Sequence, residues 1–223
     1  MDKLNNKKVA VISDTHIGYG VEDMTKLYPL LESYDFIIFN GDIFELYAED
    51  WETIKNGSGK SLLSWMEKNP KKFVYVVGNH DDKLWRYKGS LPFKPLEKYE
   101  FIQNDKYFIC IHGHQFDKRT LNNWFFKVEH FVSNLFKFNL QKWLEDKNFW
   151  FVRRRIENTI LLPVRSRARS YVINKGCDYL IHGHTHHPNE ERVENMIVID
   201  QGRMFYDPMY VEIKNGIPVS KTI

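Results

Sequence analysis

The sequence predicts an α/β fold in which a β-sheet is covered by helices. Between residues 8 and 116, short apolar runs rich in β-branched and aromatic residues alternate with segments that suit helices. A second section rich in strand patterns begins at Tyr179 and continues to the C-terminus. Alternating strand and helix patterns are typical of sheets that bury their faces under helices.

Five apolar runs are predicted as buried strands, because each is short, β-rich and closed by a turn residue. They cover residues 9–13, 36–39, 73–77, 108–111 and 179–181. Helices are predicted over 25–33, which is amphipathic, and over 61–68, which ends near Pro70. Further strands are predicted over 196–199 and 209–213, with an Asn215-Gly216 turn after the second of them.

A polar cluster stands at the end of each of the five strand runs. The clusters are Asp14-Thr15-His16, Gly41-Asp42, Gly78-Asn79-His80-Asp81, His112-Gly113-His114 and Gly183-His184-Thr185-His186. One such cluster is common by chance, but five in equivalent places are not. Because the carboxyl ends of the strands in an α/β sheet converge on one rim, a single shared metal site is the economical interpretation.

Length and composition favour one globular domain over residues 1–223, which is enough chain to bury a full core. The formal net charge of +3 is too small to indicate a nucleic-acid partner by itself. Cys110 and Cys177 are expected to be buried, reduced thiols of a cytoplasmic protein. Neither an N-terminal apolar signal region nor a stretch of membrane-spanning length is visible, so a soluble protein is expected.

Residues 118–176 differ from the rest of the chain, because strand patterning gives way to aromatic and basic residues. The segment holds 13 basic and four acidic residues. Trp124, Val128, Phe131, Leu135 and Phe138 recur at three- and four-residue steps and would form one helical stripe. We expect a helical insert that caps the site. Its aromatics are either a small helical core with a solvated charged face, or a lid that contacts acyl chains or an anionic membrane surface.

The polar clusters offer carboxylate oxygen and imidazole nitrogen without thiolate, which suits Mn²⁺, Zn²⁺ or Fe²⁺ rather than a structural zinc. Two cations about 3.5–4 Å apart need a bridging carboxylate, and they clamp a phosphate while a bridging hydroxide attacks in line. Asp42 is the natural bridge. Asp14, His16 and one late histidine could complete the first metal, and Asn79, His112 and the other late histidine the second.

His80 is the expected catalytic acid, because it adjoins Asn79 and can protonate the leaving-group oxygen or stabilise its charge. Asp14, itself a catalytic candidate, or Asp81 could orient the His80 ring. Glu45 is expected to support a ligand by hydrogen bonding. Three other histidines, each beside a better candidate, are expected to be structural or to support ligands: His114, His182 and His187.

These residues resemble the motifs of the calcineurin-like metallophosphoesterase superfamily, namely Asp-x-His, Gly-Asp-x-x-(Asp/Glu), Gly-Asn-His-(Asp/Glu), His-Gly and Gly-His-x-His. The resemblance runs in order from about residue 9 to 188 and implies a four-layer αββα sandwich with a dinuclear, Mn²⁺-type site. It further implies two ligand sets that share Asp42. Asp14, His16, Asp42 and His186 would hold one metal, and Asp42, Asn79, His112 and His184 the other.

Within the superfamily the chain is most similar to the UDP-2,3-diacylglucosamine hydrolases of lipid A biosynthesis. The similarity rests on residues 41–47, on residues 181–188 and on a hydrophobic helical insert between the last two motifs. It implies a pyrophosphatase that takes acyl chains under the insert, at the inner face of the membrane. The implied substrate-binding residues are Arg153, Arg165, Arg169 and Asp117. The chain departs from that group at His80, where the group carries arginine.

Two alternatives compete with this interpretation. A phosphodiesterase or nuclease would use the basic insert to follow a nucleic-acid backbone and its aromatics to stack bases. A catalytically silent scaffold would keep the fold for protein binding, but such scaffolds usually lose ligands, and all seven candidates are present here. The expected partner is therefore a phosphorylated lipid or nucleotide, with nucleic acid as the second choice.

Overall fold

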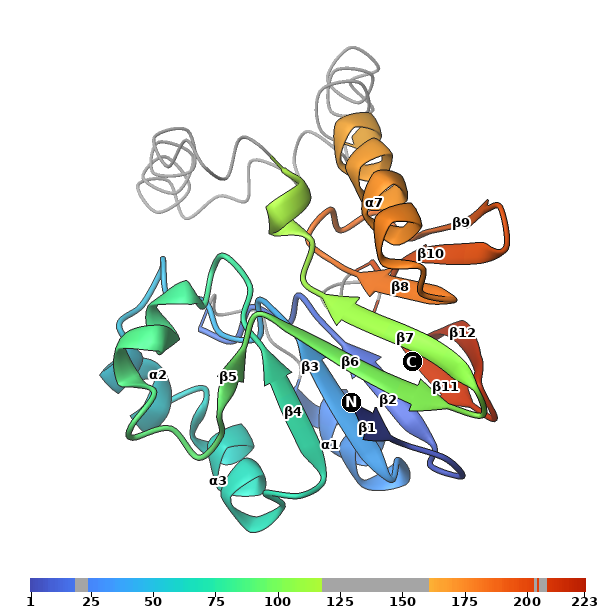
Figure 1. The fold of residues 1–223 in the computed structure, drawn as a ribbon. Coiled ribbons are helices and arrows are strands. Elements are labelled where there is room, and N and C mark those ends of the chain that lie inside the picture. The colour runs from blue at the N-terminus through green and yellow to red at the C-terminus, as the bar shows by residue number, and fades with distance from the viewer. Residues whose placement is uncertain (19–23, 118–160, 203, 205–207) are drawn as a thin grey trace.

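The structure is a computed structural model and describes residues 1–18, 24–117, 161–202, 204 and 208–223. Its strands form two six-stranded sheets (Figure 1). The first sheet has the order β12 (Ile217–Thr222), β11 (Met209–Lys214), β2 (Val9–Ile12), β3 (Phe36–Asn40), β4 (Phe73–Val76) and β5 (Pro95–Leu96). The second has the order β1 (Asp2–Lys3), β6 (Lys98–Gln103), β7 (Lys106–Ile111), β8 (Tyr179–His182), β10 (Met196–Asp200) and β9 (Asn189–Val193).

Helices cover the outer face of each sheet. The first sheet carries α1 (Met24–Ser33), α2 (Trp51–Asn56) and α3 (Lys60–Lys68), and the second carries α7 (Leu162–Lys175), as Figure 1 shows. Two short 3₁₀ helices, η1 (Asp82–Tyr87) and η2 (His114–Phe116), follow the third and fourth polar clusters. The layers are therefore helix, sheet, sheet and helix, which confirms the predicted αββα sandwich.

Three apolar clusters hold these layers together. Leu31, Ile54 and Met66 pack helices α1, α2 and α3 on the first sheet. On the other face of that sheet, Val11 and Ile38 pack toward the second sheet. The helix α7 packs on the second sheet through its own apolar side chains. Burial of one Leu or Ile side chain contributes about 1.5–3 kcal/mol, so each layer is firmly held.

The predicted elements are confirmed in the part of the chain that the structure describes. All five strand runs, both predicted helices and the 209–213 strand with its Asn215-Gly216 turn are present, with ends within two residues of the predicted ones. Helix α2, which is six residues long, is not predicted by the sequence pattern. Asp50 begins this helix by accepting a hydrogen bond from the Thr53 amide (2.9 Å), and Trp51 and Ile54 bury its inner face.

Helix α7 belongs to the segment expected to form the insert, residues 118–176. Val164, Ala168 and Val172 lie one helical turn apart on the side that packs against the second sheet, so this helix is the fourth layer of the sandwich. Residues 118–160, including the aromatic stripe from Trp124 to Phe138, lie outside the described residues. The expected cap therefore stays a prediction for that stretch.

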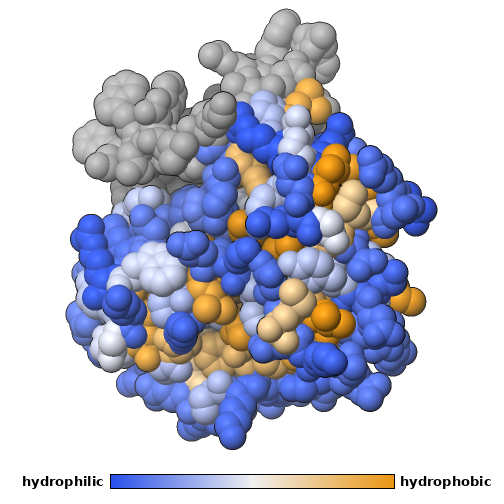
Figure 2. Space-filling model, in the orientation of Figure 1, coloured by the Kyte–Doolittle hydropathy of each residue, from blue (hydrophilic) through white to orange (hydrophobic). Residues whose placement is uncertain are grey.

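The surface is mostly hydrophilic, with apolar side chains in small groups between charged ones on the face drawn in Figure 2. Among the described helices, none is long and apolar enough to cross a membrane. Cys110 and Cys177 are free and buried, as expected, and burial raises the pKa of both thiols. Both are therefore inert packing residues.

Candidate metal centre

The predicted ligands follow strands whose directions bring them to one rim. Strands β2, β3 and β4 are parallel neighbours in the first sheet, and β7 and β8 are parallel neighbours in the second. Backbone hydrogen bonds join the loops that leave these strands: the Asp14 amide donates to Gly41 O (3.1 Å) and the Gly183 amide to His112 O (2.8 Å). These bonds tie the loops together within each sheet, and the hydrogen bond from His112 Nδ1 to the Asn40 carbonyl (3.0 Å) joins the two sheets at the rim.

Five of the seven predicted ligands have backbone angles in the left-handed region, which non-glycine residues seldom adopt. Their φ values are 54° at Asp14, 47° at His16, 53° at Asp42, 72° at His184 and 59° at His186. Such residues cost of order 1–3 kcal/mol each and persist where surrounding structure fixes them. Here the left-handed conformation turns the backbone sharply after the strand, so that the ligand side chains reach the rim.

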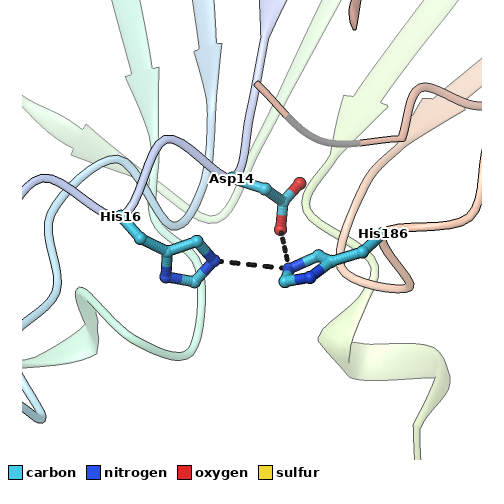
Figure 3. Close-up of side chains that lie close together, drawn as sticks. All are labelled: Asp14, His16 and His186. Atoms are coloured by element: carbon cyan, nitrogen blue, oxygen red, sulfur yellow. Dashed lines mark hydrogen bonds and ion pairs between the residues drawn. The ribbon is translucent and has the colours of Figure 1, made fainter. Parts of the chain in front are cut away.

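One donor cluster consists of Asp14, His16 and His186 (Figure 3). His186 Nε2 lies 3.2 Å from Asp14 Oδ1 and 3.3 Å from His16 Nε2. The three side chains come from two different sheets and point at one another. Burial alone would raise the pKa of Asp14, but the hydrogen bond with His186 and the nearby His112 lower it to about 2. The carboxylate is therefore ionised at neutral pH.

A second donor cluster consists of Asp42, His112 and His184. Asp42 Oδ2 lies 3.0 Å from His112 Nε2, and the His112 and His184 rings meet at a centroid distance of 5.4 Å. His112 Nδ1 lies 3.0 Å from the Asn40 carbonyl, to which it donates, so Nε2 is the nitrogen turned toward Asp42. Asn79 stands in the loop whose next residue, His80, donates its amide to Asp42 Oδ1 (2.8 Å).

Asp42 lies between the two clusters. The His16 amide donates to the Asp42 carbonyl (3.0 Å), while the Asp42 side chain faces His112. Burial opposes ionisation of this carboxyl, but the charges of His112, His80 and His16 hold its pKa well below the usual range. The Asp42 carboxylate thus contacts one cluster, and the backbone of the same residue contacts the other, so Asp42 lies where a bridging ligand would stand.

Glu45 joins His16 to His80. One carboxylate oxygen lies 2.8 Å from His16 Nδ1 and 2.7 Å from His80 Nδ1, so both rings donate to it. Glu45 was expected to support a ligand, and it does so at His16. The expectation that Asp14 or Asp81 orients the His80 ring is wrong, because Nδ1 of that ring donates its hydrogen bond to Glu45. Burial lowers the pKa of His80, but the charges of Glu45 and Asp42 raise it to about 10.

Asp81 instead fixes the loop that carries Asn79 and His80. Its carboxylate accepts from the Gly78 amide (2.6 Å), the Ile43 amide (3.0 Å) and the Tyr75 hydroxyl (2.5 Å). Because Gly78 belongs to the third polar cluster and Ile43 directly follows the second, Asp81 locks these two clusters together. Burial, with the charge of Asp42, raises the pKa of Asp81 to about 6.

Three glycines lie so close to predicted ligands that a side chain at the glycine would overlap with the ligand. A Cβ on Gly78 would lie 2.1 Å from Asp42 Oδ1, and one on Gly183 would lie 2.4 Å from Asp14 Oδ2. Gly41 has a φ of +90°, and a Cβ there would lie 2.4 Å from the His112 ring. Each distance is far inside van der Waals contact, so only glycine fits these three positions.

Several buried polar atoms at the rim make no well-aligned hydrogen bond within the described part of the chain. Three of them belong to the predicted ligand set: Asn79 Oδ1, and Asp14 Oδ1 and His112 Nε2, which face His186 and Asp42 as ion pairs. A buried polar atom left in this way is costly, and three that belong to the predicted ligand set fit a bound cation. The donors are oxygen and nitrogen without thiolate, which suits Mn²⁺, Zn²⁺ or Fe²⁺.

The predicted substrate-binding residues are in different surroundings. Asp117 is buried, with Oδ2 3.4 Å from His184 Nε2, so it lies at the rim. Arg169 forms a two-pronged ion pair with Glu191 of β9 (2.7 and 2.8 Å). Arg165 has a buried Nε without a hydrogen-bond partner among the described residues and places its charge near Asp200. Arg153 lies outside the described residues.

The remaining histidines are placed as expected for supporting residues. His182 is buried, with Nδ1 3.1 Å from the Gly183 carbonyl, and burial lowers its pKa to about 4. His114 is also largely buried near His112 and His184, and burial lowers its pKa to about 3. The His187 amide donates to Thr185 Oγ1 (3.1 Å). The His182 and His114 rings are therefore neutral at physiological pH.

Sequence reasoning missed Asp200, which supports the last ligands. Its Oδ2 accepts a hydrogen bond (2.5 Å) from Thr185, the residue between His184 and His186, and Oδ1 accepts from the Gly202 amide (3.4 Å). The turn that presents both histidines is therefore tied to the end of β10. The available signal was the polar Asp200-Gln201-Gly202 at the end of a strand run, the same pattern that marked the other clusters.

The sandwich fold and the donor clusters define a metal-dependent hydrolase. A profile of the family described as Metallophos, calcineurin-like phosphoesterase, matches residues 7–188. The chain therefore belongs to the calcineurin-like phosphoesterase family, and it is a metal-dependent phosphoester hydrolase. This confirms the superfamily resemblance seen in the motifs. A search of curated proteins finds no match.

Solved structures share the fold at low sequence identity. A structure described as a novel archaeal phosphodiesterase has a TM-score of 0.51 at 15% identity, covering 97% of this chain and 99% of the other. Yfce, a phosphoesterase from E. coli, has a TM-score of 0.50 at 14% identity, covering 95% and 90%. A double mutant of Vps29 from Entamoeba histolytica has a TM-score of 0.50 at 13% identity, covering 97% and 98%. At these identities the likeness is one of fold alone.

Proposed function

We propose that this protein uses two divalent cations, with Mn²⁺ the expected metal, to hydrolyse a phosphoester or diphosphate bond in a lipid- or nucleotide-linked substrate. The observation that carries the proposal is the position of Asp42. Its backbone contacts His16 of one donor cluster, and its carboxylate contacts His112 of the other. A two-metal site needs a shared carboxylate in that place.

The residues divide into two ligand sets around this carboxylate. Asp14, His16 and His186 would hold one cation and Asn79, His112 and His184 the other, with Asp42 shared between them. When bound, the cations supply Lewis acidity and lower the pKa of coordinated water. The neutral Asn79 limits the negative charge that faces an anionic substrate.

His80 has the setting of a proton donor to the leaving group. Its Nδ1 donates to Glu45, which leaves Nε2 as the nitrogen available to a substrate. Because the charges of Glu45 and Asp42 keep the ring protonated, Nε2 carries a proton at neutral pH. The Tyr47 ring stands edge-on to His80 at a centroid distance of 5.0 Å and limits how the imidazole can rotate.

For the substrate, we place a UDP-2,3-diacylglucosamine-like lipid first, because the insert sequence is both aromatic and basic. An acyl chain would occupy the aromatic part, and the cationic clusters would meet the diphosphate or an anionic membrane surface on the cytoplasmic side. A nucleotide or nucleic-acid phosphodiester is the second candidate. It is favoured by His80, which takes the place of the arginine of the lipid A enzymes.

The test is hydrolysis of bis(p-nitrophenyl) phosphate by purified protein with added Mn²⁺. We expect Asp42→Asn to remove activity while the protein stays folded, as judged by circular dichroism. Asp50→Asn makes the same chemical change at the start of α2, where asparagine caps equally well, and it should leave activity unchanged. Full activity in folded Asp42→Asn protein would contradict the proposal.

A substrate panel then separates the two candidates. It compares UDP-2,3-diacylglucosamine, cyclic nucleotides, model diesters and single-stranded DNA under the same metal conditions. Selective cleavage of the lipid, with uptake of the protein by anionic vesicles, supports the first candidate. Cleavage of nucleotides or DNA, with binding that weakens steeply as salt increases, supports the second.

A further inference from the structure

Asn40 is a fully buried amide at the point where the two sheets meet beneath the metal centre. It is the last residue of β3, two positions before Asp42. The strands of the first sheet deliver Asp14, His16, Asp42 and Asn79, whereas β7 and β8 of the second deliver His112, His184 and His186. Distances between ligands of these two groups are therefore distances between sheets.

Apolar packing between the two sheets does not by itself fix the distances between their ligands. The space between the sheets is filled by side chains such as Ile38, Val76, Phe108 and Ile181. Hydrophobic attraction is non-directional and depends on the area buried. A small slide of one sheet over the other would keep most of that area, yet it would separate Asp42 from His112.

The Asn40 side chain supplies directional bonds across the same space. Its Nδ2 lies 3.3 Å from the Ile111 carbonyl, 3.4 Å from the Ile181 carbonyl and 3.3 Å from Gln201 Oε1. These acceptors come from the ends of β7 and β8 and from the residue after β10. One amide thus faces three strand ends of the second sheet.

Each contact lies next to a ligand or its support. Ile111 directly precedes His112, and the Asn40 carbonyl also accepts the hydrogen bond from His112 Nδ1 (3.0 Å). Ile181 lies three positions before His184, and the Gln201 amide donates to the His182 carbonyl (2.7 Å). A displacement of Asn40 would therefore also move His112 and the turn that carries His184.

We propose that Asn40 is a positioning residue that fixes the separation of the two sheets at the rim and thereby sets the affinity of the second metal position. The proposal rests on the metal centre proposed above. It adds that affinity depends on a side chain that touches neither metal nor substrate. Residues that orient metal ligands typically change affinity by about 10- to 100-fold when removed.

The test compares Asn40→Leu with a matched substitution, Gln103→Leu. Gln103 is also a fully buried amide, and it bonds the carbonyls of Leu4 (3.1 Å) and Lys7 (3.0 Å) at the opposite end of the strands. Both variants lose buried hydrogen bonds and should unfold at lower temperatures than the wild type. Mn²⁺ titration by calorimetry on metal-stripped protein then measures affinity at each metal position.

We expect Asn40→Leu to weaken the second Mn²⁺ position by about 10- to 100-fold, with Gln103→Leu within about twofold of the wild type. Equal affinity in folded Asn40→Leu protein, or an equal loss in Gln103→Leu, would overturn the role of Asn40. Wild-type protein that binds no Mn²⁺ would instead overturn the metal centre itself. If Asn40→Leu does not fold, Gln201→Met removes one acceptor of the same amide and must weaken Mn²⁺ binding for the proposal to stand.

Discussion

His16 Nε2 and His186 Nε2 lie 3.3 Å apart, although 170 positions separate the two residues in the chain. A hydrogen bond between the two rings does not by itself explain this contact, because Asp14 Oδ1 faces the same His186 nitrogen at 3.2 Å, while Glu45 engages the other nitrogen of His16. Two ring nitrogens and a carboxylate oxygen that face one another form half of a coordination shell. This arrangement requires left-handed, strained backbone conformations at Asp14, His16 and His186.

Bound cations should therefore stabilise the fold. Mn²⁺ at about 100 times its dissociation constant adds about 2.7 kcal/mol to the free energy of unfolding, which raises the melting temperature of a protein of this size by about 5–10 °C. His186→Ala should lose most of this shift. His187→Ala, the same substitution one position later, should keep it. Thermal unfolding with and without EDTA measures both, and an equal shift in the two variants would count against the cluster.

His80→Ala should lower kcat by about 10²- to 10⁴-fold while Mn²⁺ affinity stays within a few-fold of the wild type. The loss should depend on the leaving group. A substrate that releases p-nitrophenolate needs little protonation, so its loss should be smaller than that of an alkyl phosphodiester. Steady-state kinetics on the two substrates provide the comparison, and an identical loss on both would exclude proton donation by His80.

Gly78→Ala should reduce activity by about 10²-fold, because its Cβ would lie 2.1 Å from Asp42 Oδ1 and displace that carboxylate. Gly89→Ala is the control, since a Cβ there meets nothing within 4 Å. Mn²⁺ affinity should fall in the first variant and not in the second. Wild-type kinetics in folded Gly78→Ala protein would show that Asp42 has more room than the structure gives it.

Glu212 should make stability depend on acidic pH. Burial would raise its pKa, but hydrogen bonds from Lys221, Tyr34 and Lys8 lower it from 4.5 to about 2 in the folded protein. Because the folded pKa is depressed, the stabilisation is fully present above the unfolded value and is lost as the pH falls from about 4.5 toward 2. We expect a contribution of about 1–2 kcal/mol, since solvent screens the half-exposed Lys8 and Lys221.

Urea unfolding of the Glu212→Gln variant between pH 2 and pH 7 checks this assignment. The variant should be less stable than the wild type at neutral pH and should lose less stability on acidification. Glu67→Gln, at an exposed position of α3, should follow the wild type at every pH. If wild type and Glu212→Gln lose stability in parallel, another carboxylate is responsible.

The sequence predicted the fold and the clustering of the candidate ligands well, because both follow from strand ends. Asp14, Asp42 and His112 each stand after an apolar run, and parallel strands bring such positions to one rim. Long-range partners were harder to predict. Nothing in the spacing of residues 42–45 shows that Glu45 engages two histidines at once, and the tie between Asp200 and Thr185 exists only after β8 and β10 have paired.

Short or context-dependent elements account for the other differences. Helix α2 has only six residues and is stabilised by its Asp50 cap and by packing, which periodicity over a long window does not detect. Strand β6 has a clear alternation of buried and less buried residues, but its Lys98 and Glu100 reduce its apolar signal. Helix α7 lies within the segment predicted as a helical insert, but its packing on the second sheet makes it part of the sandwich.

The most direct measurement is anomalous diffraction from crystals soaked in Mn²⁺. Sharing of Asp42 predicts two peaks about 3.5–4 Å apart, with the Asp42 carboxylate in contact with both. One peak should lie among Asp14, His16 and His186, and the other among Asn79, His112 and His184. Fully occupied peaks that leave Asp42 uncoordinated, or a single peak at saturating Mn²⁺, would contradict the account.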